Sequence, residues 1–125
     1  MNGYKRKVFR FSIGIIAVLF LAANSAQAHA VLLEATPAPN STVAKPNLAI
    51  RLKFNVRIET PRSRLSLLLP DNSTIPVEIR KDSTADILLA QVSNLKSGKY
   101  RLRWQVLASD GHISRGEIPF TVGAS

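Results

Sequence analysis

The sequence predicts an all-β fold, a two-layer antiparallel sandwich or barrel of about seven short strands. Three observations predict it. Apolar and polar residues alternate over several stretches, which is the pattern of a half-buried strand. Turn-forming residues separate these stretches at nearly regular intervals. No stretch after residue 29 keeps the spacing of an amphipathic helix.

The first three strands are expected at 30–35, 47–54 and 64–69. The first is a short apolar run that ends in the proline-rich turn at 36–40. The second has apolar residues at every other position, with cations between them. The third is apolar and stops at Pro70, which opens a polar turn.

The later strands follow the same rule. Those at 74–79 and 86–92 flank a polar loop at 80–85, and those at 99–106 and 118–122 alternate strictly. We expect the alternating apolar residues to face the core; these are Leu48, Ile50, Leu52, Phe54, Tyr100, Leu102, Trp104, Val106, Ile118, Phe120 and Val122.

Cations alternate with the apolar residues on two of these strands, at 47–54 and 99–106. Two interpretations stay open. The cations form a docking face for an anionic partner or lipid, or they are the solvated side of a half-buried sheet, which is the commoner case.

The first 28 residues read as a secretory signal peptide. Four cations and no acid lie in residues 1–10, a 13-residue apolar core follows at 11–23, and small residues stand at Ala26 and Ala28. The apolar core is shorter than the roughly 20 residues that span a bilayer. We therefore expect cleavage after Ala28, export to an extracytoplasmic space, and a mature domain at 29–125.

Removing the signal lowers the net charge. The full chain carries +9, whereas residues 29–125 hold thirteen Lys or Arg and eight Asp or Glu, a net charge of +5. Cations scattered among acids favour solubility over nucleic-acid binding. We expect a monomer with no nucleic-acid partner and no stable membrane insertion after cleavage.

Sulfur ligands are missing from the mature chain. The sequence has no cysteine, and its one methionine is Met1. Because thiolate and thioether ligands favour Cu(I), any transition-metal site here must use nitrogen and oxygen.

Only two histidines are present, and cleavage would make His29 the first residue. A terminal histidine offers its amine and its imidazole to one ion as a chelate. His112 adds a third nitrogen and Asp110 a carboxylate oxygen, a set that suits tetragonal Cu(II). Taken singly, each residue also fits an ordinary role, because Asp-Gly is a common turn and chain ends often fray.

These residues belong to a wider pattern that resembles the CopC family of copper-resistance proteins. The resemblance covers the whole mature chain. Its most specific part is the spacing of Tyr100, Trp104, Ser109, Asp110, Gly111, His112, Gly116, Phe120 and Val122, and further matches lie at His29-Ala30, Thr36-Pro37-Ala38, Gly98-Lys99 and Gln105-Val106.

The resemblance implies a cupredoxin-like, Ig-like Greek-key sandwich or barrel in the periplasm. It also implies one Cu(II) per chain, held by the amine and imidazole of His29 with Asp110 and His112. Family members often stand beside a membrane protein of the CopD type, which makes an inner-membrane copper transporter of that type a candidate partner.

Two features depart from the family. The Met-rich Cu(I) site of some members is excluded in the mature chain. The acid that often follows the second strand is replaced by Val56, in Phe54-Asn55-Val56, and Glu59 is the nearest substitute.

The leading interpretation is a non-enzymatic Cu(II) protein that buffers or carries copper in homeostasis or resistance. One alternative is a secreted sandwich that binds a protein partner and whose histidines are incidental. The other is a copper oxygenase built on a histidine brace. The family's in-plane aspartate argues against it, because an oxygenase needs an open position for O₂.

Overall fold

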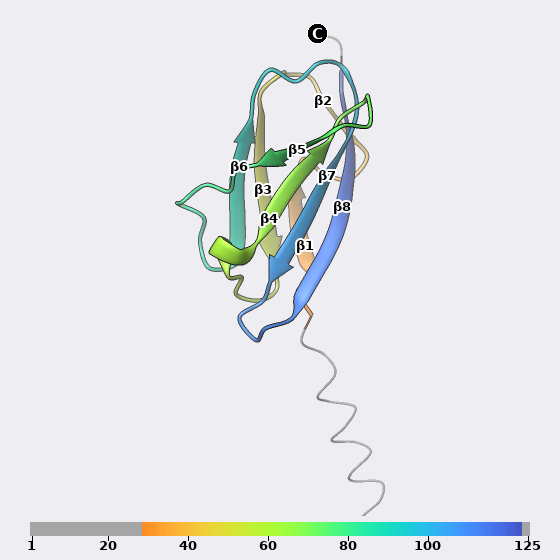
Figure 1. Ribbon diagram of the computed structural model, residues 1–125. Helices are drawn as coiled ribbons and strands as arrows, with labels where there is room; N and C mark the ends of the chain where they lie inside the picture. Colours follow the sequence, from red (N-terminus) through yellow and green to blue (C-terminus); the bar gives the residue numbers. More distant parts are fainter. Residues whose placement is uncertain (1–28, 124–125) are drawn as a thin grey trace, which may run out of the picture.

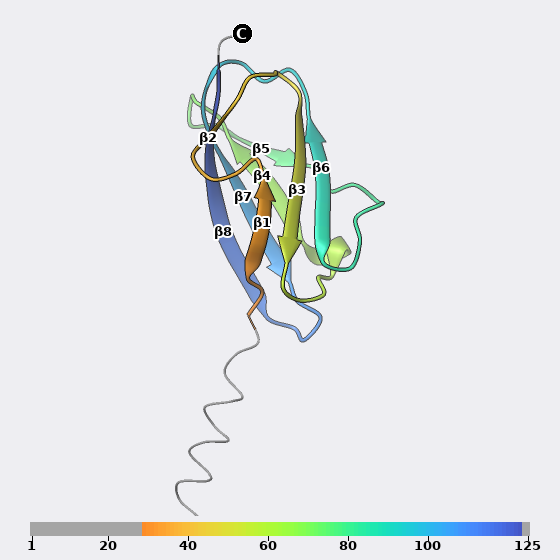
Figure 2. The same ribbon diagram turned by 180° about the vertical axis from the view of Figure 1, so that it is seen from behind.

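The computed structural model describes residues 29–123, which fold into eight strands and one short 3₁₀ helix (Figures 1 and 2). The signal peptide expected at 1–28 lies outside the described residues. The elements are β1 (Leu32–Thr36), β2 (Ser41–Val43), β3 (Leu48–Phe54), η1 (Thr60–Arg62), β4 (Arg64–Leu68), β5 (Thr74–Val77), β6 (Ile87–Val92), β7 (Gly98–Leu107) and β8 (Ile113–Val122).

The strands form two sheets that pack face to face. One has the order β1-β3-β6 and the other β2-β8-β7-β4-β5. Neighbours in a sheet are often distant in sequence, as in the Greek-key arrangement of immunoglobulin-like sandwiches. The predicted all-β sandwich is confirmed, and the described strands close no barrel.

The predicted strand set needs two corrections. The last strand, expected at 118–122, begins at Ile113 and spans ten residues as β8. β2 was missed, and it pairs parallel with β8 while the other pairings are antiparallel. Its three residues are too few to show an alternating pattern. The Asn40 backbone, with φ +62°, leads into β2, and its N–H donates to the Pro119 carbonyl at 2.6 Å. That pairing comes from the far end of the chain.

The core lies between the sheets and contains the residues expected there. Each of the eleven predicted core residues is buried, from fully buried Leu52 to Trp104 at 9 % exposure. Aromatic packing ties the sheets together: the Phe54 ring meets Trp104 edge-on at 5.2 Å between ring centroids. Strand alternation therefore decided which side chains became core.

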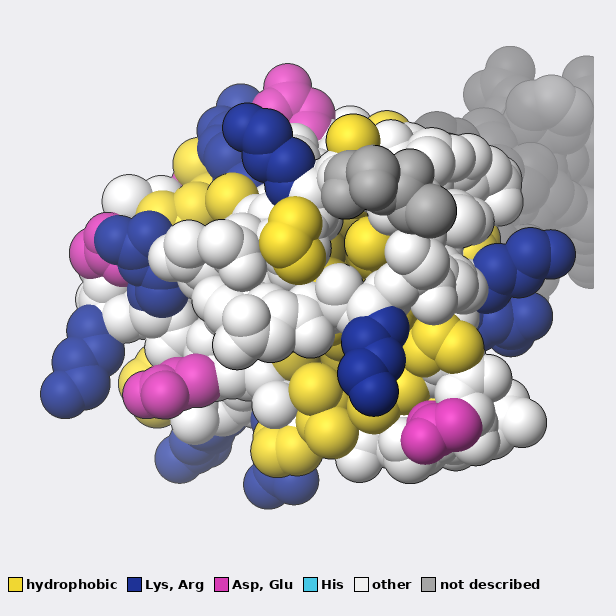
Figure 3. All heavy atoms as spheres, turned by 90° about the horizontal axis from the view of Figure 1, so that it is seen from above, with side chains coloured by type: hydrophobic (Ala, Val, Ile, Leu, Met, Phe, Trp, Pro, Cys, Tyr) yellow, Lys and Arg dark blue, Asp and Glu magenta, His cyan; other side chains and the backbone are white. Residues whose placement is uncertain are grey.

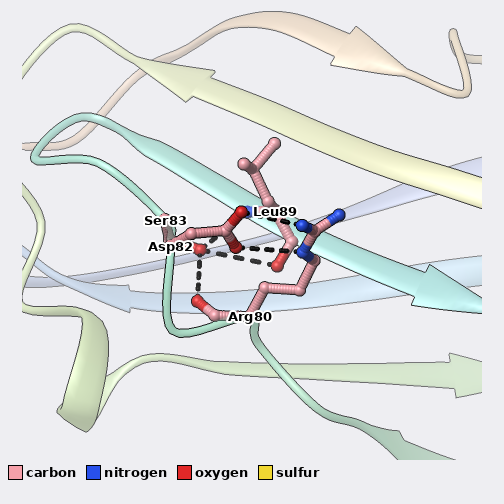
Figure 4. A network of polar contacts seen from close by, with 4 residues as sticks. All are labelled: Arg80, Asp82, Ser83 and Leu89. Carbon is pink, nitrogen blue, oxygen red and sulfur yellow. Dashed lines mark hydrogen bonds and ion pairs between the residues drawn. The ribbon is translucent and has the colours of Figure 1, made fainter.

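The predicted polar loop after β5 is held by its own side chains (Figure 4). Arg80 pairs with both carboxylate oxygens of Asp82, at 2.9 and 2.7 Å. The Ser83 hydroxyl donates to the Arg80 carbonyl at 2.8 Å and accepts from the Leu89 amide at 2.9 Å. The loop thus returns the chain to β6 in a defined turn.

The two ends of the sandwich differ. β7 ends and β8 begins at the lower end of Figure 1, where β1 also begins; we call this end the histidine end. The opposite end, seen from above in Figure 3, shows no histidine among the described residues. Within residues 29–123, no helix is long and apolar enough to cross a membrane.

Candidate metal centre

The fold brings the two histidines together at the histidine end. His29 stands just before β1, and His112 just before β8. Their ring centroids are 5.8 Å apart, with the planes at 75°. The residues are separated by 83 positions in sequence, so only the packing of the two sheets makes them neighbours.

Backbone hydrogen bonds hold the segment that carries His29. The Ala30 N–H donates to the Ser114 hydroxyl at 3.1 Å, and the Ala30 side chain is 6 % exposed within the core. The Val31 N–H donates to the side-chain oxygen of Asn55 at 2.7 Å, and the Asn55 N–H donates back to the Val31 carbonyl at 3.0 Å. His29 therefore directly precedes a backbone segment that hydrogen bonds hold in place.

A tight turn presents the other two residues. The Gly111 N–H donates to the Ala108 carbonyl, and the Ala108 N–H donates to the His112 carbonyl, both at 2.9 Å. Gly111 has φ +93°, a backbone conformation that glycine adopts without steric penalty. The turn extends the β7–β8 hairpin, so its position is set by the two longest strands.

Asp110 faces His112 within this turn. Its Oδ1 accepts the His112 backbone N–H at 3.1 Å and lies 3.3 Å from Nδ1 of the same residue. The amide hydrogen bond is the main cause that lowers the pKa of Asp110 below its usual value, against partial desolvation. The carboxylate is thus an anion, the form that binds a metal.

This geometry fits a small cation. Adjacent ligand atoms bound at about 2 Å lie roughly 3 Å apart around a metal. The 3.3 Å between Oδ1 of Asp110 and Nδ1 of His112 is compatible with both facing one ion. The two side chains are 42 % and 56 % exposed, which leaves the site open to solvent.

The candidate ligands lie at the same end of the sandwich, but their side chains do not surround a metal position. Within residues 29–123, no group of three or more His, Cys, Asp or Glu side chains is drawn together tightly enough to hold a metal ion. In the full chain the nitrogen of His29 still belongs to the peptide bond with Ala28. An amide N–H donates hydrogen bonds, whereas a free amine offers a lone pair.

The acid that family members often carry near the ligands has no hydrogen-bonded or ion-paired counterpart at the histidines in the described part. Val56, which stands at its position in the sequence, is half-buried against the core. Glu59 pairs through its backbone N–H with the Leu107 carbonyl at 2.8 Å, and no contact in the described part links its carboxylate to either histidine. Asn55 and Ser114 instead hold the N-terminal segment. Sequence reasoning missed both, although Asn55 lies inside the departure from the family pattern.

A family model, related sequences and a solved structure all indicate the same family. The family model of the CopC domain matches residues 32–123. Protein YobA of Escherichia coli K12 is 30 % identical over 116 residues, which cover 90 % of this chain and 93 % of that protein. Copper resistance protein C of Xanthomonas campestris pv. juglandis is 29 % identical over 116 residues, covering 86 % and 91 %.

A solved structure agrees with this. CopC from Methylosinus trichosporium OB3b superposes with a TM-score of 0.69 at 28 % identity, covering 77 % of this chain and 95 % of that one. The resemblance carried by the residues from Tyr100 to Val122 is thereby confirmed over the whole domain. The chain belongs to the CopC family.

Proposed function

We propose that the processed chain binds one Cu(II) ion at its histidine end and acts as a copper buffer or carrier in the periplasm. The ligands are the amine and imidazole of His29, the carboxylate of Asp110 and the imidazole of His112. The observation that carries the proposal is the approach of the two imidazoles to 5.8 Å, with an anionic carboxylate 3.3 Å from one of them.

The donor chemistry supports Cu(II). Nitrogen-rich sites favour copper over the other first-row divalent metals, and no sulfur is available after residue 1 to favour Cu(I). The relative named for copper resistance supports the same metal. Reduction of the bound ion to Cu(I) should release it, because nitrogen and oxygen ligands without sulfur suit Cu(I) poorly.

Signal cleavage is part of the proposed site. Cutting after Ala28 converts the His29 amide nitrogen into an amine and so creates the second arm of the chelate. Metal competence then begins only after export, which would keep the precursor from taking up copper in the cytoplasm. A membrane transporter of the CopD type is the proposed receiver of the ion, and the carrier acts as a monomer.

The two other functions predict different behaviour. If the histidines are incidental to a protein-binding sandwich, replacing either leaves copper affinity unchanged. A copper oxygenase needs a free position for O₂, whereas the proposed carboxylate of Asp110 occupies one. We therefore expect no oxidation of added substrate by the copper-loaded protein in the presence of a reductant.

The decisive experiment compares two forms of the same domain by Cu(II) titration and EPR. One is the exported protein, with His29 confirmed as its first residue by mass spectrometry. The other keeps a Gly-Ser extension ahead of His29 and thus every side chain of the site. For the first form we expect one Cu(II) per chain with a tetragonal nitrogen signature. For the second form we expect an affinity that is lower than that of the first by roughly a hundredfold or more. Equal affinity would exclude the amine as a ligand.

A further inference from the structure

The outer face of the five-stranded sheet concentrates the positive charge of the domain. This basic face, turned toward the viewer in Figure 1, is formed by the outward side chains of β4, β7 and β8 beside β5. Its charged members are all exposed; they are Arg64, Lys99, Arg101, Arg103, Arg115 and Glu117.

Its net charge is +4, out of +5 for residues 29–123. The rest of the described surface carries eight cations and seven acids, so it is close to neutral. A half-buried sheet needs polar residues on its outer face, but it does not need one sign of charge. Solvation of the sheet therefore does not explain why the positive charge is concentrated on this one face.

The strand register groups the cations across the sheet. Arg64 and Arg115 flank Gln105 in one row, and Arg103 stands opposite Glu117 in the next. Glu117 pairs with Arg103 at 2.9 Å and Arg101 at 3.3 Å. Within residues 29–123, Arg64, Lys99 and Arg115 have no acid within 4.0 Å. Arg115 donates through Nε to the side-chain oxygen of Gln105 at 2.8 Å, which orients its guanidinium group. None of the three cations is neutralised by an acid of the described part.

An open depression of about 660 Å³ lies among the arginines, and its charged lining residues are Arg64, Arg103, Arg115 and Glu117. Its floor is partly apolar, formed by residues such as Leu65, Pro76 and Trp104. The planar guanidinium group binds phosphate oxygens in pairs, so three of them with one acid around the depression fit an anionic headgroup. The core of a protein interface is depleted of charged residues, whereas four charged side chains surround this depression. Of the four exposed large hydrophobic residues in the described part, only Ile113 faces outward here, at the histidine end.

We propose that the basic face adsorbs to anionic phospholipid headgroups and lays the domain flat on a bilayer. The contact is peripheral, because in the described part the face exposes cations and, apart from Ile113 at the histidine end, no large hydrophobic side chain. The turn with Asp110 and His112 joins β7 to β8, the strands that bear most of the cations. Flat adsorption therefore holds the histidine end beside the membrane and leaves it open. Only this consequence for copper delivery rests on the proposed function.

The test is cosedimentation of the exported, processed protein with vesicles, without copper. Vesicles of phosphatidylcholine containing about one-third phosphatidylglycerol should bind it, and pure phosphatidylcholine should not. The triple variant R64Q/R103Q/R115Q should lose roughly tenfold or more of this binding. The matched control K45Q/K81Q/K96Q removes the same charge from exposed positions off the face and should stay within about threefold of wild type. Thermal melting of both variants checks that they fold.

Three results would overturn the proposal. The first is no binding to the anionic vesicles at about 0.1 M salt, where charges act over about 10 Å. The second is an equal loss in both triple variants, which would show attraction by net charge alone. The third is arginine-dependent binding to soluble poly-glutamate without vesicle binding, which would assign the face to an acidic protein. H112A should bind vesicles as wild type does, so failure of the copper site leaves this test intact.

Discussion

At the scale of single residues, the site depends on a few atoms with defined neighbours. His112 is the only imidazole apart from His29, so no other side chain of that kind replaces it. Asp110 is oriented by the His112 backbone N–H and faces the ring of the same residue. One turn thus presents both the carboxylate and the imidazole of the proposed site.

Replacing His112 by alanine should weaken Cu(II) binding roughly a hundredfold or more, because a nitrogen ligand is lost and the sequence has no third histidine to replace it. Cu(II) titration and the nitrogen couplings in EPR check this. S109A, in the same turn, is the control and should bind as wild type does. Unchanged affinity in H112A would support the reading in which the histidines are incidental.

The pH dependence of binding should follow the nitrogen ligands, not Asp110. Hydrogen bonding lowers the pKa of Asp110, so its carboxylate stays ionised even when the pH falls to the usual pKa of an aspartate. The terminal amine that cleavage would create gains its proton at a much higher pH, because the reference pKa of an α-amino group is about 8. Asp110→Asn should lower the logarithm of the affinity by the same amount at every pH where the carboxylate is ionised, so the slope of log affinity against pH should match wild type. A clearly different slope near neutral pH would contradict this.

The same shift has a consequence for stability. Because the pKa of Asp110 is lower in the fold than in the unfolded chain, its hydrogen bonds stabilise the fold above the unfolded value. That contribution is lost as pH falls through the folded value.

At the scale of elements, two devices set the distance between the histidines. The hairpin of β7 and β8 carries its turn on the two longest strands. The start of β1 is held from both sheets, by Ser114 at the base of β8 and by Asn55 after β3. In the described part both side chains hydrogen-bond to the backbone beside His29 and not to an imidazole, so both act by position.

Asn55→Ala should weaken copper binding about tenfold while lowering the free energy of unfolding by only about 1 kcal/mol, because one exposed hydrogen bond is lost. Asn55→Asp keeps an acceptor for the Val31 N–H and should restore much of the affinity. Cu(II) titration, denaturant melts and amide exchange at Ala30 and Val31 measure the two effects separately. Equal losses of affinity in both variants would show that the acceptor is not what matters.

At the scale of the whole molecule, the site depends on how closely the sheets pack. Gly116 lies opposite Trp104 on β7, and a Cβ at Gly116 would come within 2.3 Å of the indole ring. Trp104 in turn meets Phe54 of the other sheet edge-on. The missing side chain at Gly116 therefore lets the one tryptophan bridge the sandwich.

Gly116→Ala should lower the free energy of unfolding by roughly 1 to 3 kcal/mol, because Trp104 must leave its packed position. Trp104 fluorescence should shift in the same variant, since this is the only indole in the chain. Gly123→Ala is the matched control: its Cβ would meet a neighbour only at 3.4 Å, an ordinary contact, and stability should hardly change. A stable Gly116→Ala variant with an unmoved emission maximum would contradict the close packing.

The strands that the sequence predicted best were those whose alternation is long. β3 and β7 were expected nearly residue for residue, because a two-residue period with one apolar face determines burial locally. β2 was not predicted, because three residues show no period and their partner strand, β8, lies far along the chain. The bulge that shifts the register between Leu32 and Glu34 also depends on a partner strand.

The sequence by itself determined the all-β class, the core residues, the absence of sulfur ligands after Met1 and the three candidate ligands. Each of these follows from local pattern or from composition. Only the tertiary structure decided that His29 and His112 meet, that Asn55 and Ser114 hold the first segment, and that one sheet face carries nearly all the net charge. Those facts depend on which strands lie side by side, and pairing between distant segments leaves no period in a single sequence.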